Sequence, residues 1–161
     1  MQKTQMMNKF EITKPGKYEY QVVVDDIGQD KELLGIVRAD KEGDYEINIV
    51  SQHKVGETKC RVDVKGIVSN GARVKVKGTV KIDDGASGSD SFLAMKLLML
   101  DNKSSAVAEP ELEIKNNEVK ASHSASVGRI DEEQLFYLES RGVEKHDAEK
   151  LIIKGFLGEV E

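Results

Sequence analysis

The amino-acid sequence predicts a mainly β fold of short, regularly spaced strands, followed by two α-helices. Three observations support this: segments in which apolar and polar residues alternate, a turn signal about every 15 residues, and a helical, acidic pattern after residue 130. The turn signals lie near residues 28, 43, 56, 71, 85, 102 and 117. This repeat is typical of a β-solenoid or a sandwich, and antiparallel hairpins with Asn-Gly and Asp-Gly turns would produce a similar pattern.

The strand segments are defined by β-branched content and period-2 alternation. In residues 59–68, apolar Cys60, Val62 and Val64 alternate with charged residues. Residues 72–82 show the same alternation, with lysines at the polar positions. Residues 91–100 are a further strand, although their Leu and Met content would also allow a helix. The predicted strands are residues 18–24, 33–38, 45–50, 59–68, 72–82, 91–100, 111–114 and 118–121.

Two helices are predicted at the C-terminal side. Asp131 is a suitable N-cap, Gln134 stands at capping-box spacing, and Gly142 occupies the C′ position, which together indicate a helix over about residues 132–141. A second helix over about residues 145–160 has one apolar face. That face comprises Ala148, Leu151, Ile152, Phe156, Leu157 and Val160. We expect these helices to cap the β stack and to leave their acidic faces free for a partner.

The length of 161 residues predicts one domain with three parts. Residues 1–16 are polar and Met-rich, end in Lys14-Pro15-Gly16, and are expected to form a flexible leader. Residues 17–128 form the β core, and residues 129–161 form the C-terminal helical segment.

Charge and cysteine content exclude several classes of function. The net charge of −5 argues against a nucleic-acid partner, and the segment from Asp131 onward, with nine acidic and four basic residues, carries the imbalance. A single cysteine excludes an intramolecular disulfide and fits a reducing compartment. The longest apolar run, residues 92–100, is interrupted by Lys96 and is too short to span a bilayer, and no signal-like run begins the sequence. We therefore expect a cytoplasmic protein without a membrane partner.

Standard catalytic motifs are not present in the sequence, so we expect a protein that is not an enzyme. It has no phosphate-binding GxxxxGK[ST], nucleophile elbow, CxxC or HExxH. The small residues 85–89 are interpreted as a β-turn, and the paired acids Glu132 and Glu133 as favourable charges at a helix start.

Four residues deserve comment as candidate ligands. Cys60 is expected to pack as a buried hydrophobe, and His53 and His146 to be exposed in a turn and at a helix start. His123 follows a predicted strand among small residues, which would leave its imidazole accessible to a metal or a partner chain. A structural, hydrogen-bonded His123 is the simpler interpretation, and any metal would need ligands from a second subunit.

The segment PELEI–NNEVKASHSASVGRIDEEQLFYLESRGV–DAEKLIIKGFLGEV, within residues 110–160, closely resembles the C-terminal part of the SufB/SufD family. The family comprises scaffold proteins of the SUF system of iron–sulfur cluster assembly. Its most specific motifs here are "SRG" after "FYL" and "A..LII.GF" on the final helix, and the resemblance extends back to residue 53.

The resemblance implies a right-handed parallel β-helix followed by C-terminal helices. It implies a scaffold that pairs through its β-helix with a SufB-like subunit or with itself, and that binds a SufC-like ABC ATPase. A transient iron–sulfur cluster would form at the subunit interface, with no cofactor bound by this chain alone. His123 matches the histidine of the SufD "SHGA" motif and would contribute there as a metal ligand shared with the partner. The docking helices would present Phe136, Tyr137, Arg141, Gly142 and Phe156.

This sequence departs from the family at the expected ligands, in a way that places it closer to SufD. Ser104 stands where SufB carries a cysteine, Ser122 and Ser124 replace acidic residues beside the histidine, and Ala121 replaces a cysteine of some SufD proteins. Two hypotheses follow. One is a non-catalytic SUF scaffold subunit, and the other is a β-solenoid structural or interaction protein that does not bind a cluster.

Overall fold

The computed structural model describes residues 6–158, which form nine β-strands followed by two α-helices. The strands and helices are numbered in the order in which they occur along the chain. They are β1 (Met6–Ile12), β2 (Gly16–Val24), β3 (Asp30–Ala39), β4 (Gly43–His53), β5 (Lys59–Val68), β6 (Ala72–Ile82), β7 (Asp90–Met99), β8 (Ser105–Ile114), β9 (Lys120–Arg129), α1 (Glu132–Ser140) and α2 (Lys145–Leu157).

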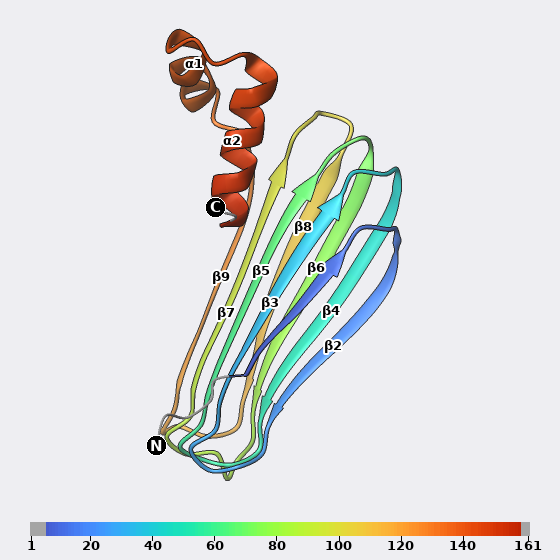
Figure 1. Ribbon diagram of the computed structural model, residues 1–161. Coiled ribbons are helices and arrows are strands. Elements are labelled where there is room, and N and C mark those ends of the chain that lie inside the picture. The colour runs from blue at the N-terminus through green and yellow to red at the C-terminus, as the bar shows by residue number, and fades with distance from the viewer. Residues whose placement is uncertain (1–5, 159–161) are drawn as a thin grey trace.

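The strands wind into a parallel β-solenoid of about four turns (Figure 1). Odd-numbered strands form one sheet in the order β1-β3-β5-β7-β9, and even-numbered strands form the other in the order β2-β4-β6-β8. From β2 onward, paired residues are 29 to 32 positions apart, as in Gly16 with Tyr45 and Arg73 with Ser105. This spacing is twice the interval between the predicted turns. The parallel pairing confirms the solenoid and excludes the sandwich and the antiparallel hairpins.

The core consists of columns of inward-facing side chains, because parallel register stacks equivalent residues of successive rungs. One column contains Leu33, Val62 and Leu93, all buried. Small residues in a column leave room for larger ones in the next rung. At Gly66, for example, an added Cβ atom would lie only 2.6 Å from Leu97 Cδ2, which is too close for a side chain to fit. β-Branched residues suit this interior because their stiff side chains pack well on a pleated surface.

Two predictions about the strands are corrected. The expected flexible leader is structured over Met6–Ile12, where β1 pairs with β3 and Phe10 stacks on Tyr20 with 3.7 Å between ring centroids; residues 1–5 lie outside the described part of the chain. The segment predicted at residues 111–114 is the end of the longer strand β8, and the segment predicted at residues 118–121 overlaps only the first two residues of β9. Residues 91–100, for which a helix was also allowed, belong to strand β7.

The first helix is capped largely as predicted. The Asp131 carboxylate accepts a hydrogen bond from the Glu133 N–H at 2.9 Å, and Gly142 adopts the left-handed conformation with φ +89°. Helix α1 ends at Ser140, one residue earlier than predicted.

Helix α2 packs on the outer face of the odd-strand sheet, and not across the end of the solenoid. Its Leu157 is buried against Ile36, Ile67 and Leu98, which point outward from that sheet. Leu151, predicted on the packed face, is 52% exposed, and Val160 lies outside the described residues. Within residues 6–158, neither helix has the length and hydropathy needed to span a membrane.

Candidate functional site

The end of the solenoid formed by β8 and β9 is its most exposed part. Within the described residues, each of these strands pairs on one side only, β8 with β6 and β9 with β7. Leu112, Ile114 and Val127 are 38%, 42% and 41% exposed. Their column neighbours one rung earlier, Val80, Ile82 and Leu97, are buried. We refer to the inward-facing side of β8 and β9 as the open end. It presents apolar side chains of the kind that elsewhere in this protein are covered by a further rung.

His123 lies at the open end, within β9 and not after a strand as predicted. Its register partner is Leu93, so it continues the column of Leu33, Val62 and Leu93. Because side chains alternate along a strand, this register places the imidazole on the inward side of the sheet. The side chain is nevertheless exposed, because no further rung covers β9 within the described residues. A histidine thus occupies an apolar column position and is accessible to a partner.

The surroundings of His123 supply few ligand atoms. Ser122 and Ser124 flank it, and Ala121 stands two residues before it. Within residues 6–158, no group of three His, Cys, Asp or Glu side chains is arranged to hold a metal ion. Iron–sulfur clusters are held mainly by cysteine thiolates, with four protein ligands in the common forms. The described residues around His123 therefore do not complete a cluster site.

Cys60 cannot serve as that thiolate in the observed fold. It is 3% exposed on the inward side of β5 and is aligned with Ser91 of β7. Burial raises the pKa of its thiol to about 12, although nearby Lys31 acts in the opposite direction. A thiol with this pKa stays protonated at neutral pH and is a poor nucleophile and metal ligand. The prediction that Cys60 packs as a buried hydrophobe is confirmed.

Ser104, which the resemblance aligned with a cysteine of SufB, has a structural role in the turn before β8. Its side chain is largely buried, and its Oγ accepts a hydrogen bond from the Gly71 N–H at 3.1 Å. The Ser104 N–H donates to the Asp101 carboxylate at 2.8 Å. The N–H groups of Asn70 and Lys103 donate to the same carboxylate, and the bonds around it hold the pKa of Asp101 below its usual value. The hydroxyl thus links the turns of two successive rungs.

His53, predicted to be exposed in a turn, is completely buried at the end of β4. It occupies a column with Val24, Ile82 and Ile114. Its Nδ1 lies 2.7 Å from Thr58 Oγ1, which in turn lies 3.0 Å from Ser89 Oγ. Its Nε2 has no hydrogen-bond partner within the described residues. Burial lowers the pKa of His53, while the charge of Asp90 acts in the opposite direction. The polar residues around His53 suggested an exposed turn, and its inward position is recognised only from its register with Val24 and Ile82.

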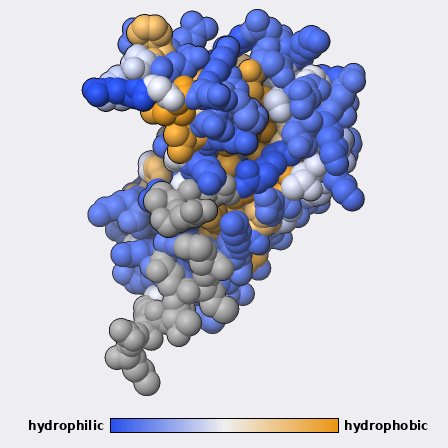
Figure 2. Space-filling model, turned by 45° about the horizontal axis from the view of Figure 1, so that its top comes forward, coloured by the Kyte–Doolittle hydropathy of each residue, from blue (hydrophilic) through white to orange (hydrophobic). Residues whose placement is uncertain are grey.

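The residues predicted to dock a partner divide into two sets. Phe136 and Tyr137 are 73% and 57% exposed on α1, and the Arg141 guanidinium lies 5.3 Å from the centre of the Tyr137 ring. Gly142 is also exposed. Phe156 is half-buried and packs with Leu157 against the odd-strand sheet. Hydrophobic patches interrupt an otherwise hydrophilic surface in Figure 2.

The open end itself could have been found from the sequence by extending the repeat. Adding about 30 residues to the predicted strand at residues 91–100 gives residues 121–130, close to the observed β9. Residues 121–126 are all small except His123, so their weak β-propensity masked this last strand.

Comparisons with known proteins agree with this architecture. The family model for the SufBD core domain of SUF-system FeS cluster assembly matches residues 13–156. An iron–sulfur cluster assembly SufBD family protein of Mycobacterium leprae is 37% identical in an alignment of 141 positions that covers 83% of this chain and 36% of that protein. A protein of the same description from Staphylococcus aureus is 36% identical over 105 residues, covering 65% of this chain and 23% of that protein. The chain thus spans about a third of the length of the Mycobacterium leprae relative, and less of the Staphylococcus aureus one.

Burial of His53 predicts a specific dependence of stability on pH. Because its pKa is lower in the folded state than the unfolded value of about 6.5, the unfolded state binds the proton first as the pH falls. The free energy of unfolding should therefore be constant above about pH 7 and should fall below pH 6.5, by at most about 1.4 kcal/mol per pH unit. Urea denaturation between pH 7.5 and 5 measures this slope.

The variant His53→Gln should lose most of that slope, since glutamine does not titrate and retains a polar group near Thr58. His146→Gln, which changes an exposed histidine, should leave the slope unchanged. An equal slope in wild-type and His53→Gln proteins would contradict the assignment.

Proposed function

This chain belongs to the SufBD family, and from this premise we propose that it is a non-catalytic scaffold subunit of SUF-type iron–sulfur cluster assembly in the cytoplasm. In this proposal it pairs with another subunit through its β-helix and docks a SufC-like ABC ATPase through its C-terminal helices. The observation that carries the proposal is the uncovered last rung, where a histidine follows the buried apolar residues Leu33, Val62 and Leu93 in one column.

The open end has the properties required of a pairing surface. Within residues 6–158, its edge strands β8 and β9 have no neighbouring strand on one side, and the backbone groups there can form hydrogen bonds with the edge of another sheet. The exposed side chains of Leu112, Ile114 and Val127 would gain from burial on pairing. A second solenoid placed against this end would extend both sheets and cover the core columns. Pairing at this end also accounts for the exposure of residues that face the core in every earlier rung.

Pairing at the open end would place His123 between the two subunits. A neutral imidazole is a suitable ligand for iron, and the partner would supply the thiolates that the surroundings of His123 lack. The cluster is in this account a cargo assembled between chains. The protein's own part is to hold one imidazole in a fixed position on a rigid strand, within a surface that excludes water once it is covered.

The exposed aromatic side chains of α1 support docking of an ATPase at a second surface. Tyrosine, phenylalanine and arginine contribute strongly to protein interfaces. Phe136 and Tyr137 lie on α1, and Arg141, the C-cap of that helix, lies over the Tyr137 ring. Helix α2 attaches to the odd-strand sheet through Leu157 and Phe156, whereas α1 has no buried residue and leaves its side chains accessible. The docking surface and the open end are thus formed by different elements of the chain.

A second candidate function is a β-solenoid structural or interaction protein that keeps the SufBD fold without cluster binding. The residues around His123 favour it, since Ala121, Ser122 and Ser124 offer no thiolate or carboxylate. The two candidates share the pairing surface and differ in whether His123 binds iron.

Anaerobic reconstitution with iron and sulfide, in the presence of a SufB-type partner subunit, separates the two candidates. We expect His123→Ala to lower the iron bound per complex by at least about tenfold, as loss of a ligand at a shared site should. His146→Ala, a change at an exposed histidine on α2, is the matched control and should bind iron like the wild type. Equal iron content in the His123→Ala and wild-type complexes would support the structural protein instead.

Docking is tested by mixing the chain with a SufC-like ATPase and measuring affinity by calorimetry. The variant Phe136→Ala/Tyr137→Ala should weaken binding by about tenfold or more, because exposed aromatic residues of this kind are frequent interface anchors. Its free energy of unfolding should change by less than about 0.5 kcal/mol for each substitution, since both rings are exposed. Unchanged affinity, or no complex with the wild-type chain under reducing conditions, would contradict docking through α1.

A further inference from the structure

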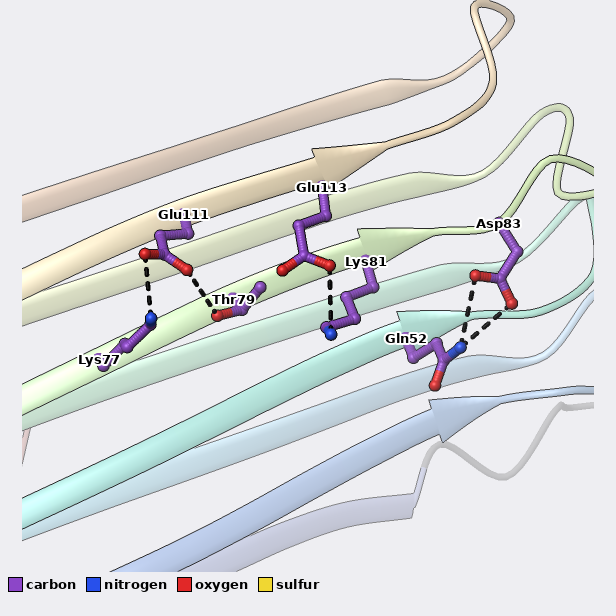
Figure 3. A network of polar contacts seen from close by, with 7 residues as sticks. All are labelled: Gln52, Lys77, Thr79, Lys81, Asp83, Glu111 and Glu113. Carbon is purple, nitrogen blue, oxygen red and sulfur yellow. Dashed lines mark hydrogen bonds and ion pairs between the residues drawn. The ribbon is translucent and has the colours of Figure 1, made fainter.

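The outer face of the even-strand sheet carries charges sorted by strand. The outward residues of β6 include Arg73, Lys75, Lys77 and Lys81, and those of β8 include Glu109, Glu111 and Glu113. Ion pairs join the two strands, with 3.0 Å between Lys75 Nζ and Glu109 Oε1, 3.0 Å between Lys77 Nζ and Glu111 Oε1, and 3.1 Å between Lys81 Nζ and Glu113 Oε2. Figure 3 shows the Lys77–Glu111 and Lys81–Glu113 pairs on adjacent strands.

The alternation continues on the other side of β6. Arg73 Nε lies 2.6 Å from Asp44 Oδ1 of β4, and Glu46 on the same strand pairs with Lys17 of β2. The bond to Arg73 holds the pKa of Asp44 below its usual value. The order of charge toward the open end is therefore acidic on β4, basic on β6 and acidic on β8. A basic strand is the one that would continue this order beyond β8.

The three glutamates of β8 form an acidic row at the edge of the sheet. Their side chains are 44%, 47% and 52% exposed despite their ion pairs with β6. A strand added at this edge would place its outward side chains directly opposite the row, with Cβ atoms about 4.5–5.5 Å apart. The charges of the row are therefore available to any chain that pairs with β8.

A second copy of this chain does not suit that position in a β8-to-β8 contact. In a two-fold antiparallel pairing centred on the strand, Glu109 lies opposite either itself or Glu111. Like charges directly opposite destabilise a strand pair. In contrast, the outward residues of β9 are Lys120, Ser122, Ser124, Ser126 and Gly128, which bring no comparable repulsion.

Resting on the proposed pairing at the open end, we infer that the acidic row of β8 selects the partner subunit. It favours a chain whose edge strand presents lysine or arginine outward at alternate positions, and it disfavours a second copy of this chain. Burial of the apolar residues at the open end favours pairing with any solenoid edge, and the charges of the acidic row determine which partner chain binds more tightly. General protection of a sheet edge by charge is the simpler alternative. That alternative predicts weak self-association without a particular requirement at β8.

A charge-swapped chain tests this inference with the protein itself as the probe. The variant K75E/K77E/K81E/E109K/E111K/E113K exchanges the two charged rows, so it keeps the ion pairs between β6 and β8 and the net charge while presenting a basic edge. Sedimentation velocity then compares the wild-type chain, the swapped chain and their equimolar mixture. We expect the mixture to form a heterodimer at least about fivefold tighter than either homodimer. Raising the salt concentration should reduce this preference.

A second variant keeps the test valid if the swapped chain does not fold. E109Q/E111Q/E113Q removes the row, and it should strengthen self-association by about fivefold and make it insensitive to salt. The matched control E19Q/D26N/E42Q removes three exposed acidic charges away from β8 and should associate like the wild type. No preference in the mixture, or equal effects of the two neutralised variants, would overturn the inference.

Binding to a SufB-type subunit distinguishes this inference from the proposed function. No complex with that subunit for the wild-type chain or any variant would count against pairing itself. A complex that is equally tight for the wild-type and charge-swapped chains would leave pairing intact and overturn only the selection by β8.

Discussion

Each rung of this solenoid depends on a neighbouring rung to pair its backbone groups and to cover its inward-facing side chains. From β3 to β7 the parallel register meets both needs, since each of these strands pairs on both sides and equivalent residues stack in buried columns. At β8 and β9 the register continues, but the cover is missing within the described residues. The open end is therefore the surface where another chain could supply both the missing backbone pairing and the missing cover of the inward-facing side chains.

The identity of the residues at the open end gives that surface its chemical character. The apolar columns end in Leu112, Ile114 and Val127, whereas the column of Leu33, Val62 and Leu93 ends in His123. A histidine inside the stack would require a polar partner, as buried His53 does with Thr58. At the last rung it is exposed and remains accessible. Position in the stack, more than residue type, thus separates a structural histidine from a candidate ligand.

Local patterns in the sequence predicted most of the fold, and the errors have physical causes. The strands at residues 59–68 and 72–82 alternate cleanly, and Asp131 and Gly142 mark the ends of α1, so each of these was predictable. The polar residues of β1 and the small residues of β9 have weak propensity and become strands through pairing with β3 and β7. Burial of His53 and exposure of Leu151 depend on register and on helix packing, which alternation and helical spacing alone do not define.

Hydrogen exchange of the β9 amides tests the central claim most directly. The chain would be measured alone and in complex with a SufB-type subunit, with exchange followed by peptide. If the open end is the pairing surface, amides of β9 and β8 should become at least about tenfold more protected in the complex, while the amides of the interior strands β3 and β5 stay unchanged. Protection confined to α1, or to the strands away from the open end, would contradict this account.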